Sequence, residues 1–140
     1  MRSVFVLIVA ILAWQFAAVA QIETVTATEA HNLQSQNGAI LIDVRTPGEW
    51  NRGGMPAGSI GISIAETDFV SRVRNIVGGD LDRQVILICQ TGVRSSHAAR
   101  LLEQNGFRNL SNVQEGIRGS WRAGPGWIKK GLPMRPFSSE

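Results

Sequence analysis

Two short apolar runs constrain the fold more than any other feature of this 140-residue chain. They cover residues 39–44 and 85–89, and a polar, turn-forming segment follows each. Short runs that are apolar on both faces are typical of strands buried between two layers of helices. We therefore expect an α/β fold in which both runs lie inside an open, mostly parallel sheet.

Helical patterns separate these runs and flank them. The form of a capping box opens the first helix, an amphipathic apolar stripe marks the second, and the third follows the second apolar run. Strands that alternate with helices predict a sheet with helices on both faces. The expected helices cover residues 26–33, 69–77 and 96–103, and weaker strands cover 59–63 and 109–113.

The first twenty residues have the pattern of a secretory signal. Arg2 precedes an apolar run that closes on Ala18-Val19-Ala20. An uncleaved anchor is the alternative, but the run is barely long enough to span the ~30 Å hydrocarbon core of a membrane. We expect a signal peptide over 1–20, one domain over 21–135 and a short tail over 136–140. The mature protein would be periplasmic or secreted, without stable membrane association.

Charge and composition exclude some classes of function. The formal net charge is only +3 and the basic residues are scattered, which argues against a nucleic-acid partner. No group of histidines and cysteines has metal-ligand spacing, so we expect neither a metal site nor a cofactor.

Cys89 is the only cysteine, and it stands at the end of the second apolar run. A single cysteine cannot pair within its own chain, so it is either a buried, inert thiol or a reactive one. Open parallel sheets bind ligands at the carboxyl ends of their strands, where we expect Cys89 to lie. The segment that follows is Gln90-Thr91-Gly92-Val93-Arg94-Ser95.

This segment has the composition of an anion-binding loop. If a helix begins near Ser95, the backbone amides of residues 90–95 would converge on a group above the sulfur. Gly92 permits a positive φ, and Arg94 together with the helix dipole would favour thiolate over thiol. We interpret Cys89 as a nucleophile in an electropositive cup; a core cysteine beside an ordinary turn is the alternative.

A set of motifs follows in a fixed order between Thr26 and Pro133. The motifs are Leu41-Ile42-Asp43-Val44-Arg45-Thr46-Pro47-Gly48-Glu49-Trp50, Gly53-Gly54-Met55-Pro56-Ala57-Gly58-Ser59-Ile60, residues 89–95, Leu101-Leu102, Gly106-Phe107 and Glu115-Gly116-Ile117. Together they resemble the single-domain rhodanese, or thiosulfate sulfurtransferase, family. The resemblance implies a five-stranded parallel sheet with flanking helices.

The resemblance also implies a reaction. Cys89 would take a sulfane sulfur from a donor such as thiosulfate, hold it as a persulfide and pass it to cyanide or a thiol. The loop amides would stabilise the persulfide, and Arg94 would attract the anionic donor. The implied partners are a small-molecule donor and acceptor, and a protein acceptor remains open.

The sequence departs from the family pattern in two places. Gly54 stands where the family usually has histidine, and we expect this to affect local packing more than chemistry. Extra residues around 122–127 precede Gly131-Leu132-Pro133. Within them, Trp127 either roofs the active site or packs in the core, and an aromatic residue near a chain end favours packing.

Asp43 and Arg45 follow the first apolar run and form either an acid–base pair or a structural pair. Sulfur transfer needs no such acid and base, so we expect a structural role, with Arg45 paired to Glu49 or Asp43. His97 is a further candidate base for Cys89, but the loop and helix already favour the thiolate.

Three other functions remain as alternatives. A phosphatase or arsenate reductase would carry C-x5-R, whereas Cys89 and Arg94 form C-x4-R. A disulfide oxidoreductase would need a second thiol. A noncatalytic or sulfur-carrier module of the same fold would keep the loop without turning over substrate.

Overall fold

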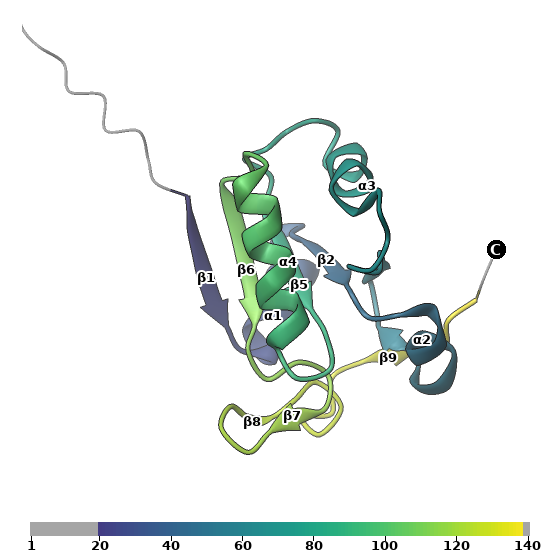
Figure 1. Ribbon diagram of the computed structural model, residues 1–140. Coiled ribbons are helices and arrows are strands. Elements are labelled where there is room, and N and C mark those ends of the chain that lie inside the picture. Colours follow the sequence, from purple (N-terminus) through teal and green to yellow (C-terminus); the bar gives the residue numbers. More distant parts are fainter. Residues whose placement is uncertain (1–19, 139–140) are drawn as a thin grey trace, which may run out of the picture.

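The computed structural model describes residues 20–138 and shows one five-stranded sheet (Figure 1). Every neighbouring pair of its strands is parallel, so the predicted α/β class and mostly parallel sheet are confirmed. In spatial order the strands are β1 (Gln21–Val25), β6 (Asn109–Val113), β5 (Val85–Ile88), β2 (Ile40–Asp43) and β4 (Ile60–Gly61).

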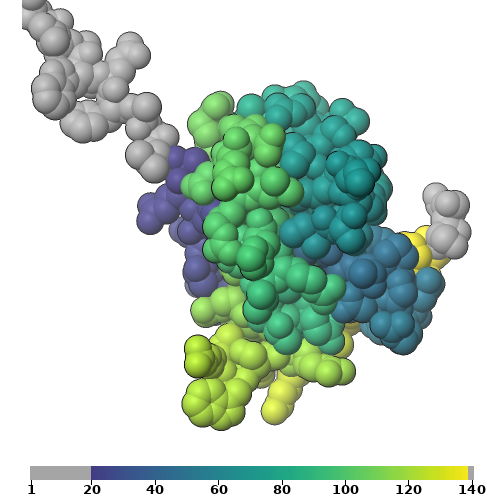
Figure 2. Space-filling view, in the orientation of Figure 1, coloured from purple at the N-terminus to yellow at the C-terminus, as the bar shows by residue number. Residues whose placement is uncertain are grey.

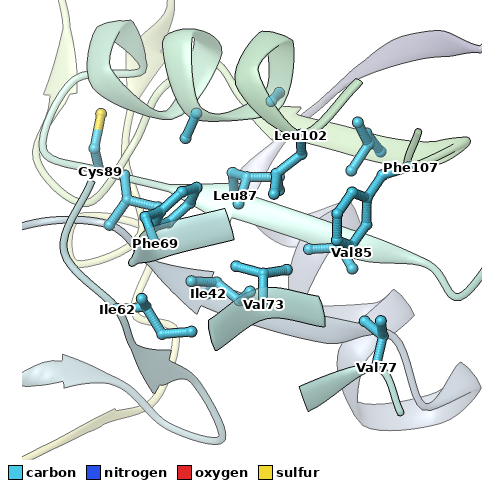
Figure 3. Close-up of a cluster of buried hydrophobic side chains, with 14 residues drawn as sticks. Ile42, Ile62, Phe69, Val73, Val77, Val85, Leu87, Cys89, Leu102 and Phe107 are labelled. Carbon is cyan, nitrogen blue, oxygen red and sulfur yellow. The ribbon is translucent and has the colours of Figure 1, made fainter. Parts of the chain in front are cut away.

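Helices cover both faces of this sheet. On one face α3 (Phe69–Ile76) and α4 (Val93–Gln104) pack against Val85, Leu87 and Cys89 (Figure 3). On the other face α1 (Ala27–Asn37) packs against Ile86 and Ile88. Successive side chains of a strand point to opposite faces, so the continuous apolar run 85–89 supplies both cores.

The helix ends follow local sequence signals, of which one was missed. Thr26 caps α1 in the predicted capping box. Thr46 forms a second capping box with Glu49 and opens α2 (Pro47–Gly53), with proline in its first turn, where we expected only a turn. The edge strand β1 was also missed. Helix α4 begins at Val93, earlier than expected.

The carboxyl-terminal residues form two small antiparallel sheets beyond the main one. Strands β7 (Gly119–Ser120) and β8 (Gly124–Pro125) make a hairpin, and β9 (Met134–Arg135) pairs with β3 (Met55–Pro56). Trp127 between them is fully buried, and its Nε1 donates to the Pro133 carbonyl at 2.9 Å. Its packing role is therefore confirmed.

Gly54 lies where β9 crosses the end of α2. Its φ is +72°, and a Cβ here would lie 2.6 Å from the carbonyl oxygen of Arg135. The backbone of β9 thus occupies the space that a side chain would need. The effect that the missing histidine has on local packing stays a prediction.

The expected signal peptide falls almost entirely on residues outside the described range. Within residues 20–138, none of the helices has the length and apolar character that a membrane span requires.

Replacing Gly54 with alanine should lower the free energy of unfolding by about 1–3 kcal/mol, because the new side chain combines a positive φ with a backbone collision. Gly53→Ala is the matched control, since a Cβ at Gly53 meets nothing within 4 Å. It should change stability by less than about 0.5 kcal/mol. Urea unfolding of both variants checks this, and equal effects would contradict the close approach of β9.

Candidate active site

Cys89 directly follows β5, the middle strand of the sheet, and is 1% exposed. Its side chain lies on the face covered by α4, and Figure 3 shows the sulfur directed toward that helix. The predicted position at a carboxyl strand end is therefore confirmed. The strand fixes the sulfur at the point where the next helix begins.

Two hydrogen-bond donors reach the sulfur. The backbone amide of Gly92 donates to Sγ at 3.2 Å, and the Ser95 hydroxyl donates at 3.3 Å. Ser95 is fully buried in the first turn of α4, whose amino end carries partial positive charge. Both donors stabilise negative charge on sulfur. We expected the loop amides, the charge of Arg94 and the helix dipole to stabilise the sulfur. Ser95 was a predicted site residue, but its hydroxyl was not foreseen as a donor to the sulfur.

The segment that follows β6 stabilises the conformation of the cysteine loop, residues 89–95. Ile117 and Arg118 donate their amides to the carbonyls of Cys89 and Gln90 at 2.9 and 3.0 Å. Gly92 has a φ of +88°, and a Cβ there would collide with the Gln114 carbonyl. Glycine is thus needed for a left-handed turn and for a close backbone approach, the first of which was predicted.

Arg94 is clamped by a carboxylate. Its Nη1 and Nη2 donate to the two oxygens of Glu49 at 2.7 and 2.8 Å. This pair lowers the pKa of Glu49 to about 2 and raises the pKa of Arg94 above its ordinary value. The guanidinium fork is therefore occupied by α2, a contact that the sequence analysis missed. Glu49 largely compensates the positive charge of Arg94, whereas we had expected this charge to be free to attract the anionic sulfur donor.

Asp43 and Arg45 form a buried ion pair beside the loop, with side chains 0% and 4% exposed. Arg45 Nη2 donates to Asp43 Oδ2 and to the Gly54 carbonyl, both at 2.7 Å. Its Nη1 donates to Gln90 Oε1 at 3.3 Å. Of the two predicted partners, Asp43 is confirmed and Glu49 is wrong, because Glu49 is engaged by Arg94. The pair connects β2, α2 and the cysteine loop.

The remaining predicted site residues lie at the rim. Gln90 borders a hollow of about 520 Å³ between α2 and the loop, together with Arg52 and Arg118. Thr91 and Val93 point to solvent, and Val93 is 61% exposed.

His97 does not hydrogen-bond to the sulfur of Cys89. His97 is exposed on α4, and its Nδ1 lies 3.4 Å from Arg100 Nη2. In residues 20–138 no group of three or more potential metal ligands comes together.

The fold and the loop define an α/β domain that presents one cysteine at the amino end of a helix. Residues 26–123 match the rhodanese-like domain family, and the chain belongs to it. The earlier resemblance is confirmed. A sulfurtransferase of Allochromatium vinosum is 28% identical over 75% of this chain and 86% of its own length.

Two solved structures are similar over most of their length. Rv0390 from M. tuberculosis is 26% identical with a TM-score of 0.68, and the match covers 82% of this chain and 98% of that chain. The polysulfide-sulfur transferase homodimer from Wolinella succinogenes is 26% identical with a TM-score of 0.63, and the match covers 85% of this chain and 82% of that chain.

Glu49→Gln should remove a pH-dependent part of the stability. The ion pair stabilises the fold fully above pH 4.5, and this contribution is lost as the pH falls toward the folded-state pKa of about 2. With Arg94 38% exposed, solvent screening reduces the contribution to on the order of 1–2 kcal/mol. Glutamine can still form the capping box with Thr46, so the lost stability measures the effect of the carboxylate charge.

The measurement is urea unfolding of both proteins between pH 2 and pH 7. The difference between Glu49→Gln and the unmodified protein should be largest at neutral pH and vanish near pH 2. Asp68→Asn, at an exposed carboxylate without a side-chain cap contact, is the control. A pH-independent difference for Glu49→Gln would contradict the assigned ion pair.

Proposed function

We propose that this protein is a sulfurtransferase that carries a sulfane sulfur as a persulfide on Cys89. The main observation in support is that Cys89 Sγ accepts hydrogen bonds from Gly92 and Ser95 at the amino end of α4. Family membership supports this assignment, and so do the similar proteins whose names specify sulfur transfer.

The reaction would proceed in two displacement steps. The Cys89 thiolate attacks the outer sulfur of thiosulfate, a new S–S bond forms, the S–S bond of thiosulfate breaks, and sulfite leaves. Cyanide or a thiolate then attacks the outer sulfur of the persulfide, which returns the Cys89 thiolate. The donors at Gly92 and Ser95 would stabilise the leaving thiolate in the second step.

Arg94 would act mainly as a positioning residue, since both of its terminal nitrogens bind Glu49. Positive charge for an anionic donor would come instead from Arg52 and Arg118, which line the adjacent hollow. The same clamp disfavours a phosphatase, whose arginine must turn inward to bind phosphate oxygens. A sulfur carrier would form the same persulfide on Cys89 but would not release the sulfur repeatedly to an acceptor. Measuring multiple turnovers of sulfur transfer therefore distinguishes this alternative from an enzyme.

Cys89→Ser should abolish thiosulfate-to-cyanide sulfur transfer, because no other cysteine exists. Thiocyanate formation measures the activity, and the melting temperature verifies folding. The unmodified protein should turn over repeatedly and hydrolyse aryl phosphates poorly. Single-turnover sulfur loading without thiocyanate production would indicate a carrier, and efficient phosphate hydrolysis alone would refute the proposal.

Ser95→Ala should lower the rate of sulfur transfer about ten- to 150-fold, because a hydrogen bond to a charged group is worth on the order of 1.5 to 3 kcal/mol. Ser96→Ala is the matched control. The Ser96 hydroxyl accepts from Arg100 at 3.2 Å and lies in the same helical turn. Equal rates for the two variants would show that the Ser95 hydroxyl does not contribute to the chemistry.

We further propose that the protein is exported and that its mature chain begins at Gln21. The support is the basic start, apolar run and Ala18-Val19-Ala20 ending of the first twenty residues. Amino-terminal sequencing of the protein from the periplasm or medium of expressing cells tests this. A membrane-bound product that retains Met1 would show an anchor instead.

A further inference from the structure

The β7–β8 hairpin presents a tryptophan that the fold does not use. Trp121 lies in its turn and is 95% exposed, whereas Trp127 after the hairpin is fully buried. The hairpin itself is tightly built. A Cβ at Gly119 would lie 2.5 Å from the Gly124 carbonyl, and the Ser120 hydroxyl accepts from the Ala123 amide at 3.0 Å. A well-ordered hairpin thus exposes the indole of Trp121 to solvent, where the side chain contributes no burial free energy to the fold.

Trp121 forms one side of a groove beside the cysteine loop. The groove has a volume of about 600 Å³, and Thr91 and Gly92 of the loop lie along it. Val93, 61% exposed at the start of α4, lines it as well. Figure 2 shows the yellow-green hairpin projecting beyond the green helix at this end of the molecule. Exposed apolar side chains of this size in one concave surface are typical of a binding site.

The groove is positively charged. Arg100 and Arg122 line it, and no carboxylate does. Arg100 donates to the Ser96 hydroxyl at 3.2 Å, and in residues 20–138 neither arginine forms an ion pair with a carboxylate. Two guanidinium groups are therefore available to anionic groups that enter the groove.

We propose that this groove docks an acidic segment of a protein that accepts sulfur from Cys89, an inference that rests on the proposed function. An apolar side chain of the segment packs on Trp121, and its carboxylates bind Arg100 and Arg122. Tryptophan and arginine are the residue types that most often dominate protein interfaces. A trough between a helix and a hairpin fits an extended chain better than it fits a flat lipid surface.

Docking would deliver a cysteine of the partner to the loop. The partner's thiolate attacks the outer sulfur of the Cys89 persulfide, and a new S–S bond forms on the partner. The bond between Cys89 Sγ and the outer sulfur breaks, and Cys89 leaves as thiolate. The partner becomes the persulfide, and the step needs no oxidant or reductant.

The test uses a synthetic peptide in which glutamates surround a leucine before a terminal cysteine. A second peptide carries glutamine in place of each glutamate. With thiosulfate as donor, the acidic peptide should accept sulfur with a kcat/KM about tenfold above that of the glutamine peptide. Arg122→Glu should abolish this preference, because it removes a partner of the carboxylates. Trp121→Ala should lower kcat/KM for both peptides, because both carry the leucine. Cyanide rates and melting temperature should be unchanged in both variants.

Arg83→Glu is the matched charge control, because Arg83 is exposed at the opposite, amino end of β5. It should retain the preference. An absent preference, a preference that survives Arg122→Glu, or a kcat/KM unaffected by Trp121→Ala would overturn the docking proposal. Trp121-dependent binding to anionic lipid vesicles or Trp121-dependent self-association, without peptide preference, would also overturn it.

A binding measurement separates docking from catalysis. In Cys89→Ser, the acidic peptide with serine for cysteine should blue-shift the tryptophan emission, and Trp121→Ala should remove the shift. Trp50 and Trp127 are buried, so within residues 20–138 Trp121 dominates the solvent-exposed signal. No shift would overturn the docking site. A shift in this variant, together with an unmodified protein that fails to transfer sulfur even to cyanide, would leave a surface that binds acidic segments but refute the proposed function and, with it, the acceptor role.

Discussion

The site depends on a buried guanidinium. Arg45 is 3% exposed, and a charge removed from water in this way is tolerated only when it is paired and hydrogen-bonded. Asp43 supplies the counter-charge, and the Gly54 carbonyl and Gln90 side chain accept further hydrogen bonds. These partners belong to β2, the end of α2 and the cysteine loop. Because the buried charge of Arg45 needs all of these partners, it fixes the relative positions of three segments, and these positions define the cup around Cys89.

Around this pair the cup is built from backbone more than from charged side chains. The segment after β6 donates hydrogen bonds to the carbonyls of Cys89 and Gln90, which fixes the course of the loop. Negative charge on sulfur is met by one amide, one hydroxyl and the amino end of α4. Arg94 serves the same architecture through Glu49, which also caps α2. Such a preorganised environment is suited to stabilising a sulfur anion, the form required by the proposed reaction.

The sequence predicted the core well because its signals are local. The run 85–89 and the capping box at Thr26 were sufficient for a strand and a helix, and Cys89 lies where strand polarity predicts. Failures arose where long-range contacts decide. The pairing of Glu49 with Arg94 joins residues far apart in the sequence, and the space beside Gly54 is filled by β9. The capping box at Thr46 was a readable local signal that was overlooked, whereas the exposure of Trp121 was not visible in the sequence.

The central claim is that Cys89 carries sulfur as a covalent persulfide. Intact mass spectrometry of the purified protein before and after thiosulfate, and again after cyanide, tests it directly. The account predicts a gain of one sulfur atom that maps to Cys89, disappears with cyanide and does not form in Cys89→Ser. An unchanged mass after thiosulfate and other sulfane-sulfur donors, in a folded protein with free Cys89, would contradict it.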